Sequence, residues 1–310
     1  MNREEEIRSP NFIIGGTSAG GTSFMSAIMI QHPEIYMPAE MRPEPHFFYK
    51  SWEYEKGANY YLSKWFSKVP RGAVAVGERS SSYLFGGREV AKRVVDQYPE
   101  IKLIFVLRNP MERAWANYRY TVLQGLEDLS FEDALAREDE RVKNQRGIWS
   151  EIQPHNYTGR SFYGKQIKEF YEFFHKDNIL ILKSELLSSD TSVQMAKIYS
   201  FLGLNLVDYK HLPVPNFTSV NVVDAAMQKQ LRDYFGNRFD SVIETIRKEQ
   251  SLESLVDSSS DKEMLQKLKR NMTGKKQLMK NEQRKYLRKL FFDDMLLLKE
   301  YVDFDITDWV

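Results

Sequence analysis

Cysteine is absent from this chain, and the net charge is close to zero. Without cysteine there is no disulfide scaffold, no thiolate nucleophile and no Cys-ligated metal. The 44 Lys and Arg residues face 43 Asp and Glu residues, which leaves a formal net charge of +1. Broad binding to duplex DNA needs a field of uncompensated cations, so we expect no nucleic-acid partner. A local anion pocket is still allowed.

Long apolar runs are absent as well. The longest, such as Leu103–Leu107, fall far short of a membrane span. The first residues, Met1–Pro10, are charged where a signal peptide would be apolar. We therefore expect a cytoplasmic location and no membrane partner. The chain has 310 residues, of which 42% are hydrophobic, and we predict a single domain over residues 1–310.

Short apolar runs predict four buried strands: Phe12–Gly15, Val74–Glu78, Lys102–Leu107 and Ile179–Leu182. Because these runs do not alternate with polar residues, they suit a parallel sheet that is covered on both faces. Helical patterns accompany them: Thr22–Gln31, Met111–Gln124, the apolar face from Tyr163 to Phe174, Ser192–Leu202, roughly Ala225–Lys248 and Glu282–Tyr301. The alternation predicts an α/β fold, a three-layer sandwich with helices on both faces of a central parallel sheet.

Two unusual segments follow one another near the C-terminus. Ser251–Asp261 is rich in Ser and acidic residues and is the best candidate for a mobile loop. The basic run Lys267–Lys280 comes next, and it suits either a solvated helix face or a flap that closes over an anionic ligand. We therefore predict a mobile loop or flap over residues 251–280.

A glycine-rich turn joins the first predicted strand to the first predicted helix. This arrangement directs backbone N–H groups and a helix N-terminus at one point, where an anion is favoured. The candidate anion-binding residues are Gly16, Thr17, Ser18, Ala19, Gly20, Gly21, Thr22 and Ser23. Gly15, Gly20 and Thr22 fit the nucleotide-hydrolase P-loop, but Gly21 stands in place of its lysine, which argues against a kinase. The alternative is a turn that merely starts a helix.

Further motifs occur in a fixed order along the chain: His32–Ile35, Glu44–Phe48, Glu78–Tyr83, Leu107–Ala114, Ile179–Leu187, Phe201–Leu204 and Asp303–Trp309. Together with the loop they resemble the sulfotransferases that use 3′-phosphoadenosine 5′-phosphosulfate (PAPS). The resemblance is strongest to the branch that includes the heparan sulfate sulfotransferases and their bacterial relatives, and it covers about residues 11 to 309. It implies a parallel α/β sheet with P-loop-like topology.

The resemblance also implies how the donor is held. The loop Gly16–Ser23 would bind the 5′-phosphosulfate, and Arg108 would pair with the 3′-phosphate, to which an arginine fork is suited. Asn117 and Tyr163 complete the donor-binding candidates. PAP would be the product nucleotide, and no metal is expected because the family uses protein cations.

Two positions depart from the family pattern. The family usually carries Lys or Arg where Ser18 stands, and a serine on the 3′-phosphate where Ala116 stands. We expect Arg79, Arg42 or a lysine of the run Lys267–Lys280 to replace the missing loop cation.

The resemblance also implies three catalytic residues. Glu44 falls on the glutamate that acts as general base, and we expect Phe47 and Phe48 to raise its pKa. His46 is a base in an alternative mechanism or orients the acceptor. Arg79 aligns with a lysine of the active centre and would stabilise the developing charge. The alternatives are a surface carboxylate for Glu44, and for Arg79 an ion pair with Glu78 or Glu112.

The predicted reaction moves a sulfuryl group from PAPS to a hydroxyl, an amine or a carbamoyl nitrogen of a small acceptor, for example in secondary metabolism. An aromatic cluster is a candidate acceptor wall: Trp52, Tyr54, Tyr60, Tyr61 and Trp65. Trp149, His155 and Tyr157 are ambiguous. The alternatives are a glycan sulfotransferase, a small-molecule kinase and a non-catalytic nucleotide-binding relative. The sequence leaves a homodimer open.

Overall fold

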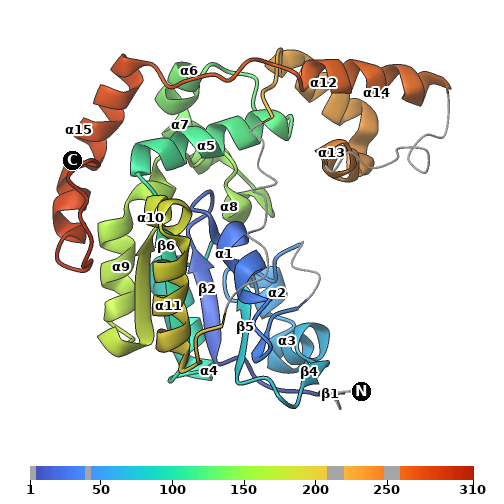
Figure 1. The fold of residues 1–310 in the computed structure, drawn as a ribbon. Helices are drawn as coiled ribbons and strands as arrows, with labels where there is room; N and C mark the ends of the chain where they lie inside the picture. Colours follow the sequence, from blue (N-terminus) through green and yellow to red (C-terminus); the bar gives the residue numbers. More distant parts are fainter. Residues whose placement is uncertain (1–4, 39–42, 208–219, 248–258) are drawn as a thin grey trace. The chain divides into compact units, whose positions relative to one another are not determined.

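The computed structural model describes residues 5–38, 43–207, 220–247 and 259–310 (Figure 1). Their contacts divide the chain into two compact units. The first unit consists of Met1–Arg113, Gly159–Pro213 and Arg288–Val310. The second consists of Ala114–Thr158 and Val214–Leu287. Among the described residues, no helix is both long enough and apolar enough to cross a membrane.

The first unit is built on a five-stranded parallel sheet. Its strands, in spatial order, are β3 (Ile35–Tyr36), β5 (Ala75–Arg79), β2 (Phe12–Gly16), β6 (Lys102–Leu107) and β7 (Ile179–Lys183). The four predicted strands are therefore confirmed, with ends shifted by at most one residue. Strand β3 was not predicted because two residues give no hydrophobic pattern. A short antiparallel pair, β1 (Glu5–Glu6) and β4 (Val69–Pro70), completes the described strands.

Helices cover both faces of this sheet (Figure 1). On one face, α1 (Thr22–Met29) and α11 (Thr191–Leu202) share a buried core with side chains such as Ile104 and Val106 of β6. On the other face, the Phe105 ring of β6 lies 5.0 Å from Phe170 of α9 (Tyr163–Tyr171), which packs beside α4 (Gly87–Gln97). Successive strand residues point to opposite faces, so a continuous apolar strand needs helices on both sides. The predicted three-layer α/β fold is confirmed.

The C-terminal residues are fastened to this unit by polar contacts. Lys183 Nζ, at the end of β7, lies 2.7 Å from Asp308 Oδ1 and 5.3 Å from the centre of the buried Trp309 ring. Asp294 of α15 (Asn281–Leu298) accepts hydrogen bonds from the N–H groups of Gly164 and Lys165, at 2.8 and 3.0 Å. It therefore caps α9 from a distant part of the chain. The other helical segments described within this unit are α2 (Ser51–Tyr54), α3 (Gly57–Trp65), η1 (Gly159–Ser161), η2 (Lys176–Asn178) and α10 (Ser184–Ser189).

The described part of the second unit is helical. Its elements are most of α5 (Pro110–Leu123), α6 (Phe131–Ala136), α7 (Glu138–Asn144), α8 (Trp149–Ile152), α12 (Ala225–Phe235), η3 (Gly236–Arg238), α13 (Phe239–Arg247), α14 (Ser259–Asn271) and the start of α15. The single helix predicted over Ala225–Lys248 was wrong. The chain breaks at Gly236, where a φ of 51° ends α12 and η3 turns into α13.

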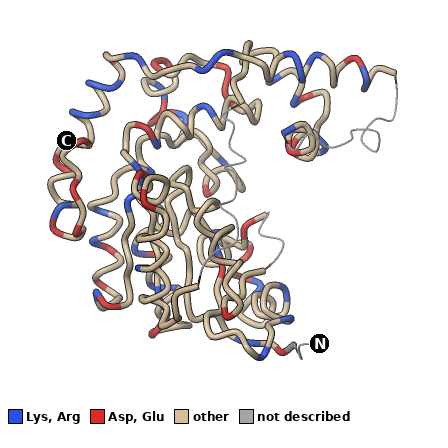
Figure 2. The backbone as a smooth tube through the Cα atoms, viewed as in Figure 1, with Lys and Arg blue, Asp and Glu red and all other residues tan. Residues whose placement is uncertain are grey.

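Residues 259–271 were predicted as part of a mobile loop or flap, but they form helix α14. Leu265 and Leu268 are buried in the core of the second unit, and this burial explains why a helix forms there. Lys267, Lys269 and Arg270 are exposed on the same helix. Figure 2 shows Lys and Arg positions in blue along α14. Residues 251–258 of the predicted loop lie outside the described residues, and closure over a ligand stays a prediction.

Burial of Trp309 predicts that the end of the chain stabilises the first unit. Replacing Trp309 with Ala should lower the free energy of unfolding by about 3–5 kcal/mol, because a large buried side chain is removed. Trp149 is 38% exposed, so Trp149→Ala is the matched control and should change stability by less than about 0.5 kcal/mol. Urea unfolding of both variants measures the difference, and equal stabilities would contradict the prediction.

Candidate functional site

The glycine-rich loop runs from the end of β2 to the start of α1, and backbone hydrogen bonds hold it in place. The N–H of Thr17 donates to Val106 O (3.0 Å), and the N–H of Gly20 donates to Thr17 O (2.9 Å). A Cβ on Gly20 would lie 2.6 Å from Val106 O, so no larger residue fits there without displacing backbone. The loop is therefore held tightly against β6.

Gly21 leads into α1 with a left-handed φ of 95°, which favours glycine. No side chain caps this helix. The first N–H groups of a helix have no intrahelical acceptor, and they carry the positive end of the helix dipole. The start of α1 is thus a suitable place for an anionic group, as the sequence predicts.

Arg108 lies beside this loop. It follows β6, and its Nη1 donates to Ala19 O at 3.3 Å. The hydroxyl of the fully buried Tyr163 donates to the Arg108 carbonyl at 3.0 Å, so Tyr163 supports the Arg108 backbone from within the core. Asn117 belongs to the second unit, and its amide donates to Thr121 Oγ1 at 3.4 Å. Of these predicted donor-binding residues, the first unit brings together the loop, Arg108 and Tyr163.

The three predicted catalytic residues meet at the start of α1. Arg79 ends β5, and its Nη1 donates to Ser23 Oγ (2.9 Å) and pairs with Glu44 Oε1. Glu44 Oε2 accepts hydrogen bonds from the N–H and the hydroxyl of Ser81, both at 2.7 Å. His46 Nε2 lies 3.2 Å from the same oxygen. Glu44 is therefore no isolated surface carboxylate, and Arg79 pairs with Glu44 rather than with Glu78 or Glu112.

The charge of Glu44 differs from the expectation. Burial pushes the pKa of its carboxyl upward, but His46, Arg79 and the two Ser81 hydrogen bonds outweigh burial and hold the pKa below 4.5. The expected rise in pKa was wrong because these contacts outweigh burial; Phe47 and Phe48 themselves lie in the core. The Phe47 ring stacks on Tyr61 at 4.5 Å.

His46 is neutral near pH 7. Burial, and then the nearby cations Lys50, Arg160 and Arg79, lower its pKa to about 4, against the opposing effect of Glu44. A neutral imidazole beside a carboxylate is best satisfied when the facing nitrogen carries the proton. We therefore place the hydrogen on Nε2, directed at Glu44 Oε2.

Residues that the motifs did not single out also shape this site. Ser81 supplies the two hydrogen bonds to Glu44 described above. Arg160 is almost fully buried, with Nη1 at 3.2 Å from Ser82 Oγ and its guanidinium 4.2 Å from the centre of the Phe85 ring. It affects the pKa of His46, yet it lies 114 residues farther along the chain, outside every motif. Only proximity in the fold identifies it.

The aromatic cluster predicted as an acceptor wall is divided. Tyr61 and Trp65 are buried in the core. Trp52, Tyr54 and Tyr60 are half-buried. Lys50 lies over the Trp52 ring, and Lys56 and Lys64 lie over the Tyr60 ring. The cluster thus does not form one continuous aromatic wall.

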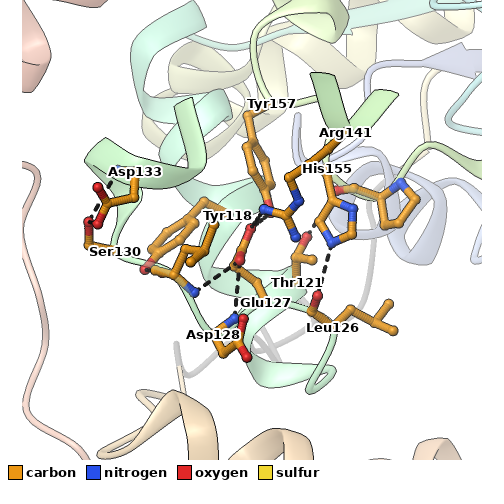
Figure 3. Close-up of polar contacts among 12 residues, drawn as sticks. Tyr118, Thr121, Leu126, Glu127, Asp128, Ser130, Asp133, Arg141, His155 and Tyr157 are labelled. Atoms are coloured by element: carbon orange, nitrogen blue, oxygen red, sulfur yellow. Dashed lines mark hydrogen bonds and ion pairs between the residues drawn. The ribbon is translucent and has the colours of Figure 1, made fainter. Parts of the chain in front are cut away.

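The ambiguous residues His155 and Tyr157 belong to a polar cluster of the second unit (Figure 3). Its centre is the fully buried Glu127, which accepts hydrogen bonds from Arg141 Nη1 (2.6 Å) and from the Tyr157 hydroxyl (2.7 Å). His155 is held between Leu126 O and the Gln145 amide, at 2.9 and 3.2 Å. These groups satisfy one another, which is the pattern of a structural network. Trp149 lies exposed on α8.

The residues present fit an anionic group at the loop in spite of the serine that stands where the family usually carries a cation. Ser18 is half-buried and carries no charge, but Arg79 reaches Ser23 at the end of the loop and Arg108 reaches Ala19 in its middle. Of the other predicted substitutes for the loop cation, Arg42 lies outside the described residues. The run Lys267–Lys280 belongs to the second unit.

The tight packing at Gly20 can be tested directly. Gly20→Ala should destabilise the protein by about 1–3 kcal/mol, because its Cβ would collide with the Val106 carbonyl. A Cβ on Gly72 would have no heavy atom within 4 Å, so Gly72→Ala is the control and should be neutral or slightly stabilising. Thermal unfolding distinguishes the two variants. An unchanged midpoint for Gly20→Ala would show that the loop is looser than described.

Comparison with known proteins agrees with this geometry. The family description "Sulfotransferase domain" matches residues 9–306. Heparan sulfate glucosamine 3-O-sulfotransferase 6 of Homo sapiens is 29% identical over 64% of this chain and 54% of its own length. Bifunctional heparan sulfate N-deacetylase/N-sulfotransferase 4 of Mus musculus is 26% identical over 63% of this chain and 22% of its own length.

The fold also has a counterpart among solved structures. A sulfotransferase from Alicyclobacillus acidocaldarius superimposes with a TM-score of 0.68 at 23% identity, and the match covers 98% of this chain and 99% of that chain. This likeness supports the three-layer α/β fold. The chain spans about half the length of the 3-O-sulfotransferases that it matches. From the match over residues 9–306, we conclude that this chain belongs to the sulfotransferase domain family.

Proposed function

We propose that this chain transfers a sulfuryl group from PAPS to a hydroxyl or amine of a small acceptor in the cytoplasm. The observation that carries the proposal is the position of Arg79. Its guanidinium contacts Ser23 in the first turn of α1 and Glu44 opposite. One buried cation therefore joins the candidate anion site to the candidate base.

The donor would be held by the loop and Arg108. The first N–H groups of α1 and the hydroxyls of Thr22 and Ser23 are suited to the 5′-phosphosulfate. The Arg108 guanidinium suits the 3′-phosphate, because its planar fork matches phosphate oxygens. PAPS would supply the activated sulfuryl group.

Glu44 would accept the proton of the attacking hydroxyl. It is ionised near pH 7 because its pKa is lowered, and His46 Nε2 and Ser81 hold the carboxylate in place. The acceptor oxygen bonds to sulfur as the bond from sulfur to the 5′-phosphate oxygen breaks, and PAP leaves. Arg79 would stabilise the charge on the transferring group, in the way that fixed cations act in phosphoryl transfer.

Two observations favour a glycan as the second candidate acceptor. The matched relatives are named for heparan sulfate. Lys267, Lys269 and Arg270 are exposed on α14. The small acceptor is favoured by the balanced overall charge of +1. Sulfation assays with hydroxylated and carbamoylated metabolites, run beside heparan sulfate fragments, distinguish the two.

Donor binding predicts a thermal shift with the product nucleotide. PAP at about 100 times its dissociation constant should add about 2.7 kcal/mol, which raises the unfolding midpoint by a few degrees. ATP with Mg²⁺ should give a smaller shift. Arg108→Ala should abolish the shift with PAP, whereas Arg137→Ala, at an exposed position in the second unit, should preserve it. A shift with ATP and none with PAP would refute the proposed donor.

The proposed base predicts a separate effect on turnover. Glu44→Gln should lower kcat about 10²–10⁴-fold, because the amide cannot accept the proton. The PAP shift should remain. Glu55→Gln, at an exposed position, is the control and should leave kcat unchanged.

The lowered pKa of Glu44 also predicts the pH profile. A carboxylate whose pKa lies below 4.5 keeps its charge as the pH falls from about 7 to about 5. Protonation of Glu44 should therefore remove activity only at a pH below its ordinary pKa. Steady-state rates of the wild type across this range provide the measurement. Loss of activity that follows a group with a pKa near 6, and that persists in Glu44→Gln, would assign the acidic limb to another residue.

A further inference from the structure

Glu78 is a buried carboxylate that the proposed mechanism does not use. It precedes Arg79 in β5, and successive residues of a strand point to opposite faces of the sheet. Its side chain is fully buried and accepts hydrogen bonds from the hydroxyls of Tyr83 (2.7 Å), Ser80 (2.7 Å) and Tyr61 (3.2 Å). Among the described residues, no Lys or Arg pairs with it. A buried carboxyl group that is held by three hydroxyl groups requires an explanation.

Two of these hydroxyls continue to the segment that carries Glu44. Ser80 Oγ accepts a hydrogen bond from the N–H of His46 at 2.7 Å. The Tyr83 hydroxyl accepts one from the N–H of Phe48 at 3.2 Å. Each hydroxyl has a single proton, and donating it to Glu78 leaves its oxygen free to accept from the backbone. Each hydroxyl thus forms a relay, which accepts a hydrogen bond from the backbone and donates one to Glu78. Glu78 therefore fixes the direction of both relays.

The held segment has an unusual backbone. His46 has a φ of 47°, which is uncommon for a residue with a side chain. The relays attach at His46 and Phe48, on and just after this turn, and Glu44 lies two residues before it. The orientation of the Glu44 side chain thus depends on the position of the His46 backbone.

We propose that Glu78 is a positioning residue, which holds the Glu44–Phe48 segment in its catalytic geometry through the hydroxyls of Ser80 and Tyr83. The proposal rests on the proposed function of Glu44. Small displacements of a catalytic group can cost about 10²-fold in rate, so a fixed backbone anchor has a large effect on turnover.

The titration of Glu78 gives this role a signature. Burial raises its pKa to about 7, against the three hydroxyl hydrogen bonds that lower it. The titratable groups that face it are Tyr61 and Tyr83, whose pKa values are raised well above 10, and Glu44, whose pKa lies below 4.5. The pKa of the neighbouring His46 is about 4. Between about pH 5 and pH 8, Glu78 is therefore the group of this cluster that changes charge.

The sign of its effect on stability follows from linkage. A carboxyl whose pKa is raised in the folded state contributes most below its unfolded value of 4.5, and this contribution is lost as the pH rises through about 7. Glutamine has no such titration. The stability of Glu78→Gln should therefore fall less steeply than that of the wild type between about pH 5 and pH 7.

The main test is a cycle of the single variants Glu78→Gln and Glu44→Gln with the double variant. The amide that Glu78→Gln introduces must donate, which turns one hydroxyl round and releases one backbone N–H. We expect kcat to fall about 10–100-fold in Glu78→Gln while the PAP shift is retained. In the Glu44→Gln background, the same change should have almost no further effect, because Glu78 acts through Glu44. Losses that multiply, or an unchanged kcat, would overturn the proposal.

A second measurement does not require activity. Amide hydrogen exchange at His46 and Phe48 should be slow in the wild type and faster in Glu78→Gln. Ser80→Ala should release His46 alone, and Tyr83→Phe should release Phe48 alone, so each relay is tested even if Glu78→Gln folds poorly. The control is Tyr118→Phe, which removes a buried tyrosine hydroxyl that donates to Leu129 O in the second unit and should change neither amide.

The two measurements separate the two proposals. Unchanged exchange in all three variants contradicts the positioning role of Glu78. Faster exchange in these variants, together with full turnover in Glu44→Gln, contradicts the proposed function of Glu44 instead. In that case the role of Glu78 in holding the Glu44–Phe48 segment is still confirmed.

Discussion

The buried ion pair between Arg79 and Glu44 is the contact on which the rest of the site depends. Both side chains are largely shielded from water, with 5% and 14% of their surface exposed. Taking two charges out of water is costly, and their attraction compensates only when further hydrogen bonds satisfy both groups. Ser23, Ser81 and His46 provide those contacts here. Removing one partner would leave a buried charge without compensation, which typically costs about 3–5 kcal/mol.

This pair also accounts for a loop that lacks the usual cation. A charge need not lie within the loop to act on a ligand there, because a poorly solvated interior screens it only weakly. Arg79 reaches the first turn of α1 from the neighbouring strand, and Arg108 reaches the loop from the strand on the other side. The parallel sheet brings the carboxyl ends of β5 and β6 to either side of the loop that follows β2. Ligands commonly bind at this edge of open α/β sheets.

The sequence predicts those parts of the fold whose pattern is local. The four longer strands are continuous apolar runs, and the loop has glycines where the backbone has no room for a side chain. Glu44, His46 and Arg79 were predicted from short motifs, and the structure brings the three side chains together. The pKa of Glu44 was not predictable, because it depends on Ser81 and Arg79, which only the fold brings to it. Arg160 and the contacts of Glu78 were missed for the same reason. Gly236, a single residue within an otherwise helical pattern, gave too weak a signal to place the break between α12 and α13.

The fastening of α9 and β7 by residues near the C-terminus has a consequence for the order of events during synthesis. Strand β7 lies at the edge of the sheet, and Lys183 at its end contacts Asp308. The start of α9 is capped by Asp294, about 130 residues later. A ribosome delivers these partners later than α9 and β7, so both elements lack these contacts while the intervening residues are made. A partly folded chain whose packing is incomplete is prone to association with other chains. Rapid translation of the residues between Lys183 and Asp308, or a chaperone bound in the meantime, would limit this exposure.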